Sequence, residues 1–314
     1  MTPKTLHSVG ERKLIQMLTA TRGSGAGVLV GPGDDAAVVR PRKGRDLALK
    51  CDAIVEGVHF FPATAPQWIG HKAVARVLSD FAAIGATPRH LLISLAAPAS
   101  TPVQRIRAIY RGIHKIADAH SVSVVGGETV RASQLALHVF GAGDVPRGGV
   151  LKRSGAKPGD IIMVTGALGG SLAGRHLRFL PRVEQGRWLA EKKWATAAVD
   201  LSDGLSTDLS HLITASGVGA DVLASEVPIA AAAEKLRDGK SPIEHALKDG
   251  EDFELLFTVP RAKVESFATA WMRRFDLAVS PIGFITREKG VVRLINDDHS
   301  VQNITFNAYE HFSH

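Results

Sequence analysis

Polar and apolar residues in the first half of the chain follow the two periods of regular secondary structure. Residues Asp46–Asp52 alternate with a period of two, which predicts a half-buried strand. Between Trp68 and Gly85 the apolar residues recur every three or four positions and the run closes on a glycine, as in an amphipathic helix. The same patterns predict one further helix, Val103–His120, and three further strands, His90–Ala96, Val122–Gly126 and Leu135–Gly141.

A second half begins after Pro146–Gly149, a short segment rich in residues that break helices and strands. A strand is predicted over Ile161–Thr165, ahead of a glycine-rich bend. Another strand, Ala197–Leu201, leads into a helix over Leu205–Ser216. The remaining predicted elements are one helix, Arg261–Arg274, and three strands, Leu255–Pro260, Val279–Ile285 and Val291–Ile295.

The length of 314 residues is large for a single core and fits two α/β domains. A boundary within the breaker-rich segment gives domains of residues 1–148 and 149–314. We therefore predict a mixed α/β (α+β) fold of two domains.

Composition favours a globular protein of the cytoplasm. Hydrophobic residues make up 45% and charged residues 22%, which are ordinary values. The first residues carry charges throughout, and no window approaches the roughly 18 apolar residues of a membrane span, so we expect neither a signal peptide nor a membrane partner. The single cysteine, Cys51, excludes an internal disulfide and a zinc site built from cysteines.

The net charge of +7 and the sequence pI of about 9.6 raise nucleic acid as a possible partner. The positive charges are scattered, however, and aromatic residues make up only 6% of the chain, so platforms for stacking bases are scarce. We expect no nucleic-acid partner.

Four acidic clusters stand out against this basic background, each beside small residues or at the end of a strand-like run. They are Gly33–Asp35, Cys51–Asp52, Asp200–Gly204 and Asp249–Glu254. Any one of them is explained most simply as a turn. Together they indicate oxygen ligands for hard cations such as Mg²⁺, and divalent cations in a basic protein suit a polyphosphate ligand.

Seven short motifs, in order from residue 31 to residue 312, resemble those of the thiamine-monophosphate kinase family. They are Gly31–Val39, Val55–Phe60, Ser79–Ala86, Arg153–Asp160, Asp200–Leu209, Gly250–Phe257 and Tyr309–Phe312. The wider superfamily also holds aminoimidazole ribotide synthetase, selenophosphate synthetase and a hydrogenase-maturation protein. The sequence contains no Walker A motif and no kinase glycine-rich loop.

The resemblance implies a fold, a reaction and two cofactors. The N-terminal domains would pair in a homodimer and close a β-barrel, and the C-terminal domain would be α/β. The enzyme would use ATP and several Mg²⁺ ions to transfer the γ-phosphate to a small-molecule phosphate, thiamine monophosphate. Phosphate binding would then rest on metal ions, helix N-termini and isolated cations.

The resemblance also implies a role for individual residues. The metal ligands would be Asp34, Asp52, Asp80, Glu128, Asp200 and Asp203. Nucleotide contacts would come from Gly127, Arg153 and Ser202, and substrate contacts from His59, Glu251 and Tyr309. Structural roles remain open beside these: Asp34 as a turn residue, Asp203 as a helix N-cap and Asp80 as a solvent-facing helix residue.

The chain departs from the family's pattern at three places. Glu128 stands where the family usually has aspartate, and Lys50 and Cys51 stand where it usually has hydroxyl residues. Because a strand alternates with period two, Lys50 and Asp52 are predicted to share a face, where the ammonium could take the position of a metal. The segment Leu172–Arg178 has an apparently shortened helix. These departures leave two alternatives open: a paralogue that binds nucleotide or a thiamine-like ligand without efficient transfer, and another enzyme of the superfamily.

Overall fold

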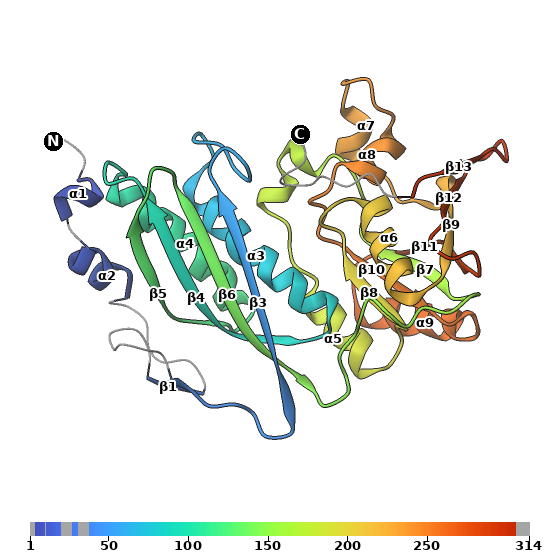
Figure 1. Ribbon diagram of the computed structural model, residues 1–314, viewed down its shortest axis with the longest axis horizontal. Helices are drawn as coiled ribbons and strands as arrows, with labels where there is room; N and C mark the ends of the chain where they lie inside the picture. Colours follow the sequence, from blue (N-terminus) through green and yellow to red (C-terminus); the bar gives the residue numbers. More distant parts are fainter. Residues whose placement is uncertain (1–3, 10, 20–26, 31–37, 306–314) are drawn as a thin grey trace. The chain divides into compact units, whose positions relative to one another are not determined.

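The computed structural model describes residues 4–9, 11–19, 27–30 and 38–305 (Figure 1). Asp34 and Tyr309, two of the predicted site residues, lie outside the described residues. The chain divides into two compact units: unit 1 comprises Met1–Phe81 and Thr87–Arg147, and unit 2 comprises Ala82–Ala86 and Gly148–His314. Each unit carries its own main β-sheet together with helices, so the mixed α/β fold predicted from the sequence is confirmed.

Unit 1 is built on a four-stranded sheet with the strand order β3-β6-β4-β5. Its strands are β3 (Arg45–Val55), β4 (Thr87–Ala97), β5 (Ser123–Arg131) and β6 (Ala136–Pro146). The pairs β3/β6 and β4/β6 are antiparallel, and β4/β5 is parallel. The smaller elements of this unit are α1 (Leu6–Val9), α2 (Glu11–Thr19), β1 (Val28–Val30) and β2 (Val38–Val39).

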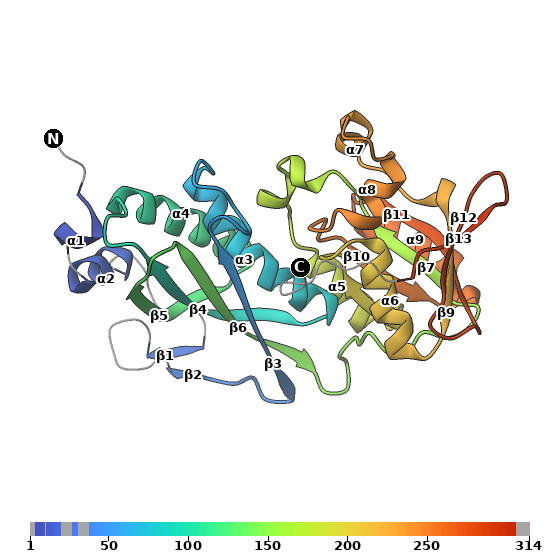
Figure 2. The ribbon, with the colours of Figure 1, turned by 45° about the horizontal axis from the view of Figure 1, so that its top comes forward.

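Two long helices, α3 (Pro66–Ala83) and α4 (Val103–Ala119), cover one face of this sheet (Figures 1 and 2). The two helices cross closely where each carries a glycine. A Cβ atom at Gly70 would lie 2.0 Å from the carbonyl oxygen of Ile109, and one at Gly112 would lie 1.9 Å from that of Gln67. Their bounds agree with the predicted helices to within about two residues at each end, which shows how far the period of 3.6 could be followed.

The opposite face of the unit 1 sheet carries exposed apolar side chains. Leu49 on β3 is 72% exposed, Phe140 on β6 is 45% exposed and Leu92 on β4 is 41% exposed. Phe140 is the register partner of both Cys51 and Leu92, so these residues line up across three strands. We call this the open face of unit 1.

Strand β5 extends further than the sequence pattern predicts. The prediction ended this strand at Gly126, but it continues to Arg131 in parallel register with β4. Glycine is a poor strand former, yet Gly127 is required here because a Cβ atom would lie 1.9 Å from the carbonyl oxygen of Ile93. Tertiary pairing therefore overrides the local propensity of this segment.

Unit 2 is built on a seven-stranded sheet with the order β13-β12-β9-β11-β7-β10-β8. The strands are β7 (Ile161–Thr165), β8 (Ala197–Asp200), β9 (Gly219–Leu223), β10 (Leu255–Val259), β11 (Val279–Thr286), β12 (Val292–Ile295) and β13 (Val301–Asn303). The pair β12/β9 is parallel, and the other pairs are antiparallel. The α-helices are α5 (Val183–Glu191), α6 (Leu205–Ser216), α7 (Ala231–Lys235), α8 (Pro242–Lys248) and α9 (Val264–Arg274).

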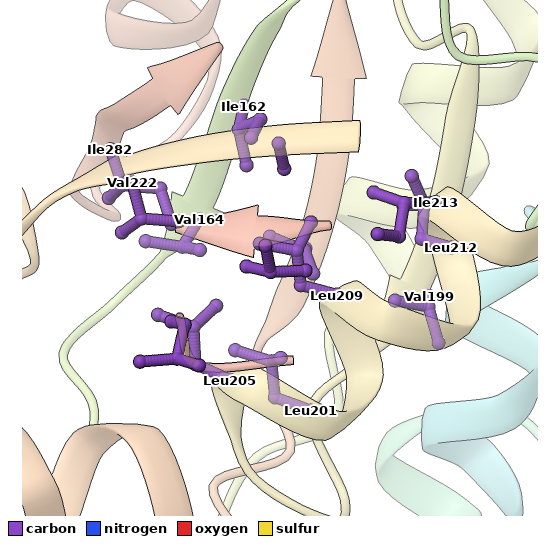
Figure 3. Packing of buried hydrophobic residues seen from close by; sticks show 14 of the residues in the cluster. Ile162, Val164, Val199, Leu201, Leu205, Leu209, Leu212, Ile213, Val222 and Ile282 are labelled. Carbon is purple, nitrogen blue, oxygen red and sulfur yellow. The ribbon is translucent and has the colours of Figure 1, made fainter. Parts of the chain in front are cut away.

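Both faces of the central strands in unit 2 are buried. On one face the leucines of α6 pack with Val164, Val199 and their neighbours (Figure 3). On the other face Phe257 of β10 lies 5.7 Å from Phe267 and 6.2 Å from Trp271 of α9, measured between ring centroids. All five residues of β10 are buried, which explains why the sequence shows a continuous apolar run there.

No helix among the described residues is long and apolar enough to cross a membrane.

Candidate active site

Two of the predicted metal ligands, Asp52 and Asp80, lie between the unit 1 sheet and α3. Asp52 is on β3 and Asp80 is on α3. Arg76 holds the Asp52 carboxylate, with Nε 3.0 Å from Oδ2 and Nη2 3.4 Å from Oδ1. The ammonium of Lys50 lies 3.0 Å from Oδ2 of Asp80. Lys50 and Asp52 are two apart on β3, and Arg76 and Asp80 are four apart on α3. The strand and the helix each carry one basic and one acidic side chain, and each acid pairs with the base on the other element. We call the two acids, Asp52 and Asp80, the unit 1 acidic pair.

Glu128 lies on the opposite face of the same sheet. Its register partner on β4 is Ser94, two residues from Leu92 on the open face. Asp52 points to the face covered by the helices. Its register partner on β6 is also the register partner of Ile93, which is fully buried beneath the helices. Glu128 and Asp52 also stand on the two edge strands of the sheet. Within one chain the structure does not bring Glu128 to the unit 1 acidic pair.

His59 follows β3 in a tight loop and is half-buried. Its Nδ1 accepts a hydrogen bond from the backbone N–H of Val55 at 3.2 Å, which leaves the proton of a neutral ring on Nε2. Its carbonyl oxygen accepts a bond of 2.8 Å from the ammonium of Lys72, a lysine with no exposed surface. The backbone and a buried cation thus fix the position of this residue.

In unit 2 the predicted ligands Asp200 and Asp203 lie at the junction between β8 and α6. Asp200 ends the strand and is 5% exposed, and Asp203 is exposed just before the helix. Asp208 and His211 on α6 join Asp203: one ligand atom from each lies within 4.8 Å of the others. We call Asp200, Asp203, Asp208 and His211 the unit 2 acidic group. The side chain of Asp208 is 2% exposed, and its Oδ2 accepts the backbone N–H of Asp203 at 2.9 Å.

Asp203 does not cap α6. The residue before the helix is Gly204, at a φ of 95°, and no side chain caps that end. A Cβ atom at position 204 would lie 2.7 Å from the carbonyl oxygen of Leu247, so α8 packs against this turn. The alternative that Asp203 serves as the helix N-cap is therefore wrong, and its carboxylate is available for another role.

Crowded carboxylates change the acid–base properties of this group. Burial raises the pKa of Asp208 well above its usual range, and the charges of Asp200 and Asp203 add to the rise. The pKa of His211 is lowered, first by burial and then by the positive charge of Arg153. Arg153 thus acts electrostatically on the group, although its side chain is exposed. A positive ion placed among these oxygens would reverse the penalty on ionised Asp208.

Glu251 lies beside the same junction in an unusual backbone conformation. Its N–H donates to the carbonyl oxygen of Ser202 at 2.7 Å, which ties two of the predicted site residues together. Its Oε2 is 2.8 Å from Nδ1 of His176. Glu251 has a φ of 53° and Phe253 has a φ of 51°, values that are rare for residues with side chains. Such conformations cluster at functional sites, where the surrounding structure holds them.

The neighbouring acids of this motif serve the fold of unit 2. Glu254 is 2% exposed and accepts two bonds from Arg182, at 2.7 and 2.6 Å. Asp252 is 1% exposed, accepts the N–H of Gly169 and accepts a bond of 2.7 Å from Arg175. Burial raises the pKa of Asp252 to about 6, against the opposing effect of Arg175. These carboxylates therefore tie the motif to the Leu172–Arg178 region, which forms two short 3-10 turns.

Some residues of these arrangements were not selected from the sequence. Asp208 and His211 have the spacing i, i+3 on a predicted helix, a signal that could have found them. Arg76 is likewise four residues before Asp80 on a predicted helix. Arg175 and Arg182 reach Asp252 and Glu254 from more than seventy residues away, and no local pattern identifies such partners.

Family models match both halves of the chain. The model of the AIR synthase related protein, N-terminal domain, matches residues 33–145, and that of the C-terminal domain matches residues 170–295. The fold agrees: a hydrogenase maturation protein HypE from E. coli superposes with a TM-score of 0.76 at 21% identity, over 96% of this chain and 97% of that one. The family models and the fold thus define an AIR synthase related protein.

Closer relatives define the family. Thiamine-monophosphate kinase of Rhodopirellula baltica is 40% identical over 84% of this chain and 85% of its own, and that of Salmonella typhimurium is 34% identical over 97% and 98%. The crystal structure of thiamine-monophosphate kinase from Stenotrophomonas maltophilia K279a superposes with a TM-score of 0.79, at 34% identity over 90% of this chain and 94% of that one. The structure of AaThiL complexed with AMPPCP and TMP superposes with a TM-score of 0.74, at 31% identity over 99% and 100%. The chain belongs to the thiamine-monophosphate kinase family.

Proposed function

We propose that this protein is an ATP-dependent kinase that converts thiamine monophosphate to thiamine diphosphate. The observation that carries the proposal is the similarity, over nearly the whole chain, to thiamine-monophosphate kinases and to a structure holding AMPPCP and TMP. AMPPCP is an ATP analogue that cannot transfer its γ-phosphate. The complex therefore supports ATP as the donor and thiamine monophosphate as the acceptor.

The reaction forms one phosphorus–oxygen bond and breaks another. An oxygen of the acceptor phosphate attacks the γ-phosphorus of ATP, and the bond from that phosphorus to the β–γ bridging oxygen breaks, which releases ADP. Both reactants are anionic, so the main barrier that the protein must lower is electrostatic repulsion between phosphates. Arg153 suits this task because a guanidinium matches the geometry of phosphate oxygens.

The unit 2 acidic group fits a divalent cation. Its carboxylate oxygens are the ligands that Mg²⁺ prefers, and burial, with the charges of Asp200 and Asp203, raises the pKa of Asp208. Imidazole suits ions such as Zn²⁺ better than it suits Mg²⁺, so we assign His211 to the rim of the site. When bound there, Mg²⁺ would neutralise phosphate oxygens. On this proposal Asp200, Asp203 and Asp208 hold the ion, while Ser202 and Arg153 contact the nucleotide.

The substrate contacts follow from the motif around Glu251. On this proposal its carboxylate, which contacts His176, meets the cationic thiamine moiety, and the unusual backbone conformation of Glu251 supports a functional role. His59 and Tyr309 keep the substrate roles that the family resemblance implies. These assignments remain part of the proposal.

We also propose a homodimer formed through unit 1. The open face exposes leucine and phenylalanine side chains on three neighbouring strands, and contiguous apolar patches of this kind mark interaction surfaces. Pairing two such sheets would bury this face and close the β-barrel that the family resemblance implies. The apolar residues concerned are Leu47, Leu49, Leu92 and Phe140.

The position of Glu128 separates it from Asp52. Three strand intervals separate β3 from β5, which is roughly 14 Å at the usual spacing of about 4.8 Å. Asp52 and Glu128 of one chain are therefore too far apart to share an ion. Glu128 would therefore serve as a metal ligand on the open face, apart from Asp52.

Sedimentation tests the dimer. At micromolar concentration we expect about twice the chain mass of 33.4 kDa. Leu49→Lys should give monomers, because it places charge in the open face, whereas Met272→Lys, at an equally exposed apolar position in unit 2, should stay dimeric. A monomeric wild-type chain, or a dimer unaffected by Leu49→Lys, would count against this interface.

Turnover tests the function. The full chain is incubated with ATP, Mg²⁺ and either thiamine monophosphate or thiamine, and the nucleotide and thiamine products are separated. We expect ADP and thiamine diphosphate in equal amounts with thiamine monophosphate only, and no product after EDTA is added. Binding of thiamine monophosphate and ATP without any thiamine diphosphate would instead identify the non-transferring paralogue that the substitutions at Lys50 and Glu128 raise.

A further inference from the structure

Basic side chains of unit 1 neutralise the unit 1 acidic pair. Asp52 and Asp80 carry two negative charges, and Arg76 and Lys50 supply two positive ones in direct contact. The four side chains together are neutral. A divalent cation that bound these carboxylates would have to displace Lys50 or Arg76 from their oxygens.

The geometry of Arg76 strengthens this contact. Its guanidinium approaches both oxygens of Asp52 from one side, and the N–H of Ala53 donates to Oδ1 from the backbone at 2.9 Å. Three donors thus share the carboxylate of Asp52. Mg²⁺ requires near-octahedral coordination at about 2.1 Å, which this crowded carboxylate does not offer without rearrangement.

The Lys50 side chain is fixed by its place in the strand. Its register partner is Gly141, at which a Cβ atom would lie 2.6 Å from the ring of Phe81 on α3. Position 50 therefore points toward α3, and the ammonium meets Asp80 in the last turn of that helix. The side chain of Lys50 is 34% exposed and that of Asp80 is 30% exposed, so solvent and an incoming phosphate can reach both.

We propose that Lys50 and Arg76 are built-in counter-ions that replace divalent cations at Asp52 and Asp80. Unit 1 then presents ammonium and guanidinium N–H donors to phosphate oxygens, and divalent cations are left to the unit 2 acidic group. This inference deepens the proposed kinase function, on which its biological meaning rests. It concerns how many divalent ions the chain itself holds.

Binding of Mn²⁺ alone to the full chain tests the proposal without nucleotide or turnover. Free Mn²⁺ is measured by electron paramagnetic resonance during a titration of wild type, Lys50→Thr and Lys115→Thr. Lys50→Thr restores a hydroxyl and removes the counter-ion, and Lys115→Thr removes an exposed lysine of unit 1 on α4 as a matched control. We expect Lys50→Thr to bind one more Mn²⁺ per chain than wild type, and Lys115→Thr to match wild type.

Two further variants locate the added ion. Asp80→Asn in the Lys50→Thr background should abolish the extra Mn²⁺, whereas Lys50→Arg should keep the wild-type count. If Lys50→Thr does not fold, Lys50→Met removes the charge while it retains the apolar stem, and the same increase is expected. Superimposable isotherms for wild type and the charge-removing variant would overturn the proposal. Since turnover is not measured, that result is separate from a failure of the kinase function.

Discussion

The two acidic sites balance their charges in opposite ways. In unit 1 each carboxylate lies against a basic side chain, with Arg76 on Asp52 and Lys50 on Asp80. In unit 2 the carboxylates of Asp200, Asp203 and Asp208 lie near the exposed Arg153, and burial, with the charges of the other two, raises the pKa of Asp208. The carboxylates of unit 1 are therefore neutralised by the protein itself, whereas those of unit 2 favour binding of an added cation.

Acidic motifs of this protein therefore have two roles, one in stability and one in binding. A carboxylate whose partners come from its own fold contributes to stability, and one without such partners is poised to bind. Glu254 and Asp252 belong to the first kind, because Arg182 and Arg175 hold them in a buried network. Asp203 belongs to the second, since it is exposed and lies next to two other carboxylates.

Asp203→Asn should have the largest effect. We expect turnover to fall by about 10²- to 10³-fold, as when one preorganised electrostatic group is removed, with little change in thermal stability. Asp297→Asn, an exposed aspartate of the same unit, serves as the control. Unchanged turnover in folded Asp203→Asn protein would mean that the unit 2 acidic group is not part of the site.

Glu254→Gln should show the reverse pattern, with lost stability. It leaves Arg182 partly buried without its charged partner, and breaking a buried ion pair in this way costs about 3 kcal/mol. Denaturant unfolding should reveal this loss, while Glu265→Gln, at an exposed position on α9, should unfold like wild type. Equal stability of the Glu254 and Glu265 variants would show that the buried network is dispensable.

Asp208→Asn should raise stability in the absence of metal. The folded-state pKa of Asp208 lies above the unfolded value, so its contribution is full below the usual carboxyl pKa and is lost as the pH rises through the raised pKa. The variant keeps an oxygen acceptor for the N–H of Asp203 and removes the charge. With EDTA present, we expect its melting temperature to exceed that of wild type by about 2 to 4 °C at pH 8 and to converge with it near pH 4. A gap that widens toward low pH would contradict the assignment.

The sequence predicted the elements better than the contacts between them. The bounds of α6 and β7 were predicted to the residue, because α6 has a long amphipathic pattern, β7 is a nearly continuous apolar run, and a glycine or polar residue flanks each end. Strand β9 was not predicted, since a glycine and Asp221 interrupt its apolar run, and the Asp221 carboxylate is held by Arg293. Local pattern cannot show a partner supplied seventy residues later.

For the site, too, local features were predicted from the sequence and contacts between distant elements were not. That Lys50 and Asp52 share a face followed from the alternation of β3, and the structure confirms it. That Glu128 stands across the sheet from them could not be foreseen, because the predicted strand stopped at Gly126 and strand order is not encoded locally. The roles assigned to these residues in metal and substrate binding stay predictions.

The most direct test of the contrast between the two acidic sites is Mn²⁺ binding to two single-carboxylate variants. Asp203→Asn removes an exposed ligand from the unit 2 acidic group, and Asp80→Asn removes the partner of Lys50 in unit 1. We predict that Asp203→Asn loses the tightest-bound Mn²⁺, whereas Asp80→Asn retains it with the wild-type affinity. Loss of that ion in Asp80→Asn, with wild-type binding in Asp203→Asn, would contradict the contrast.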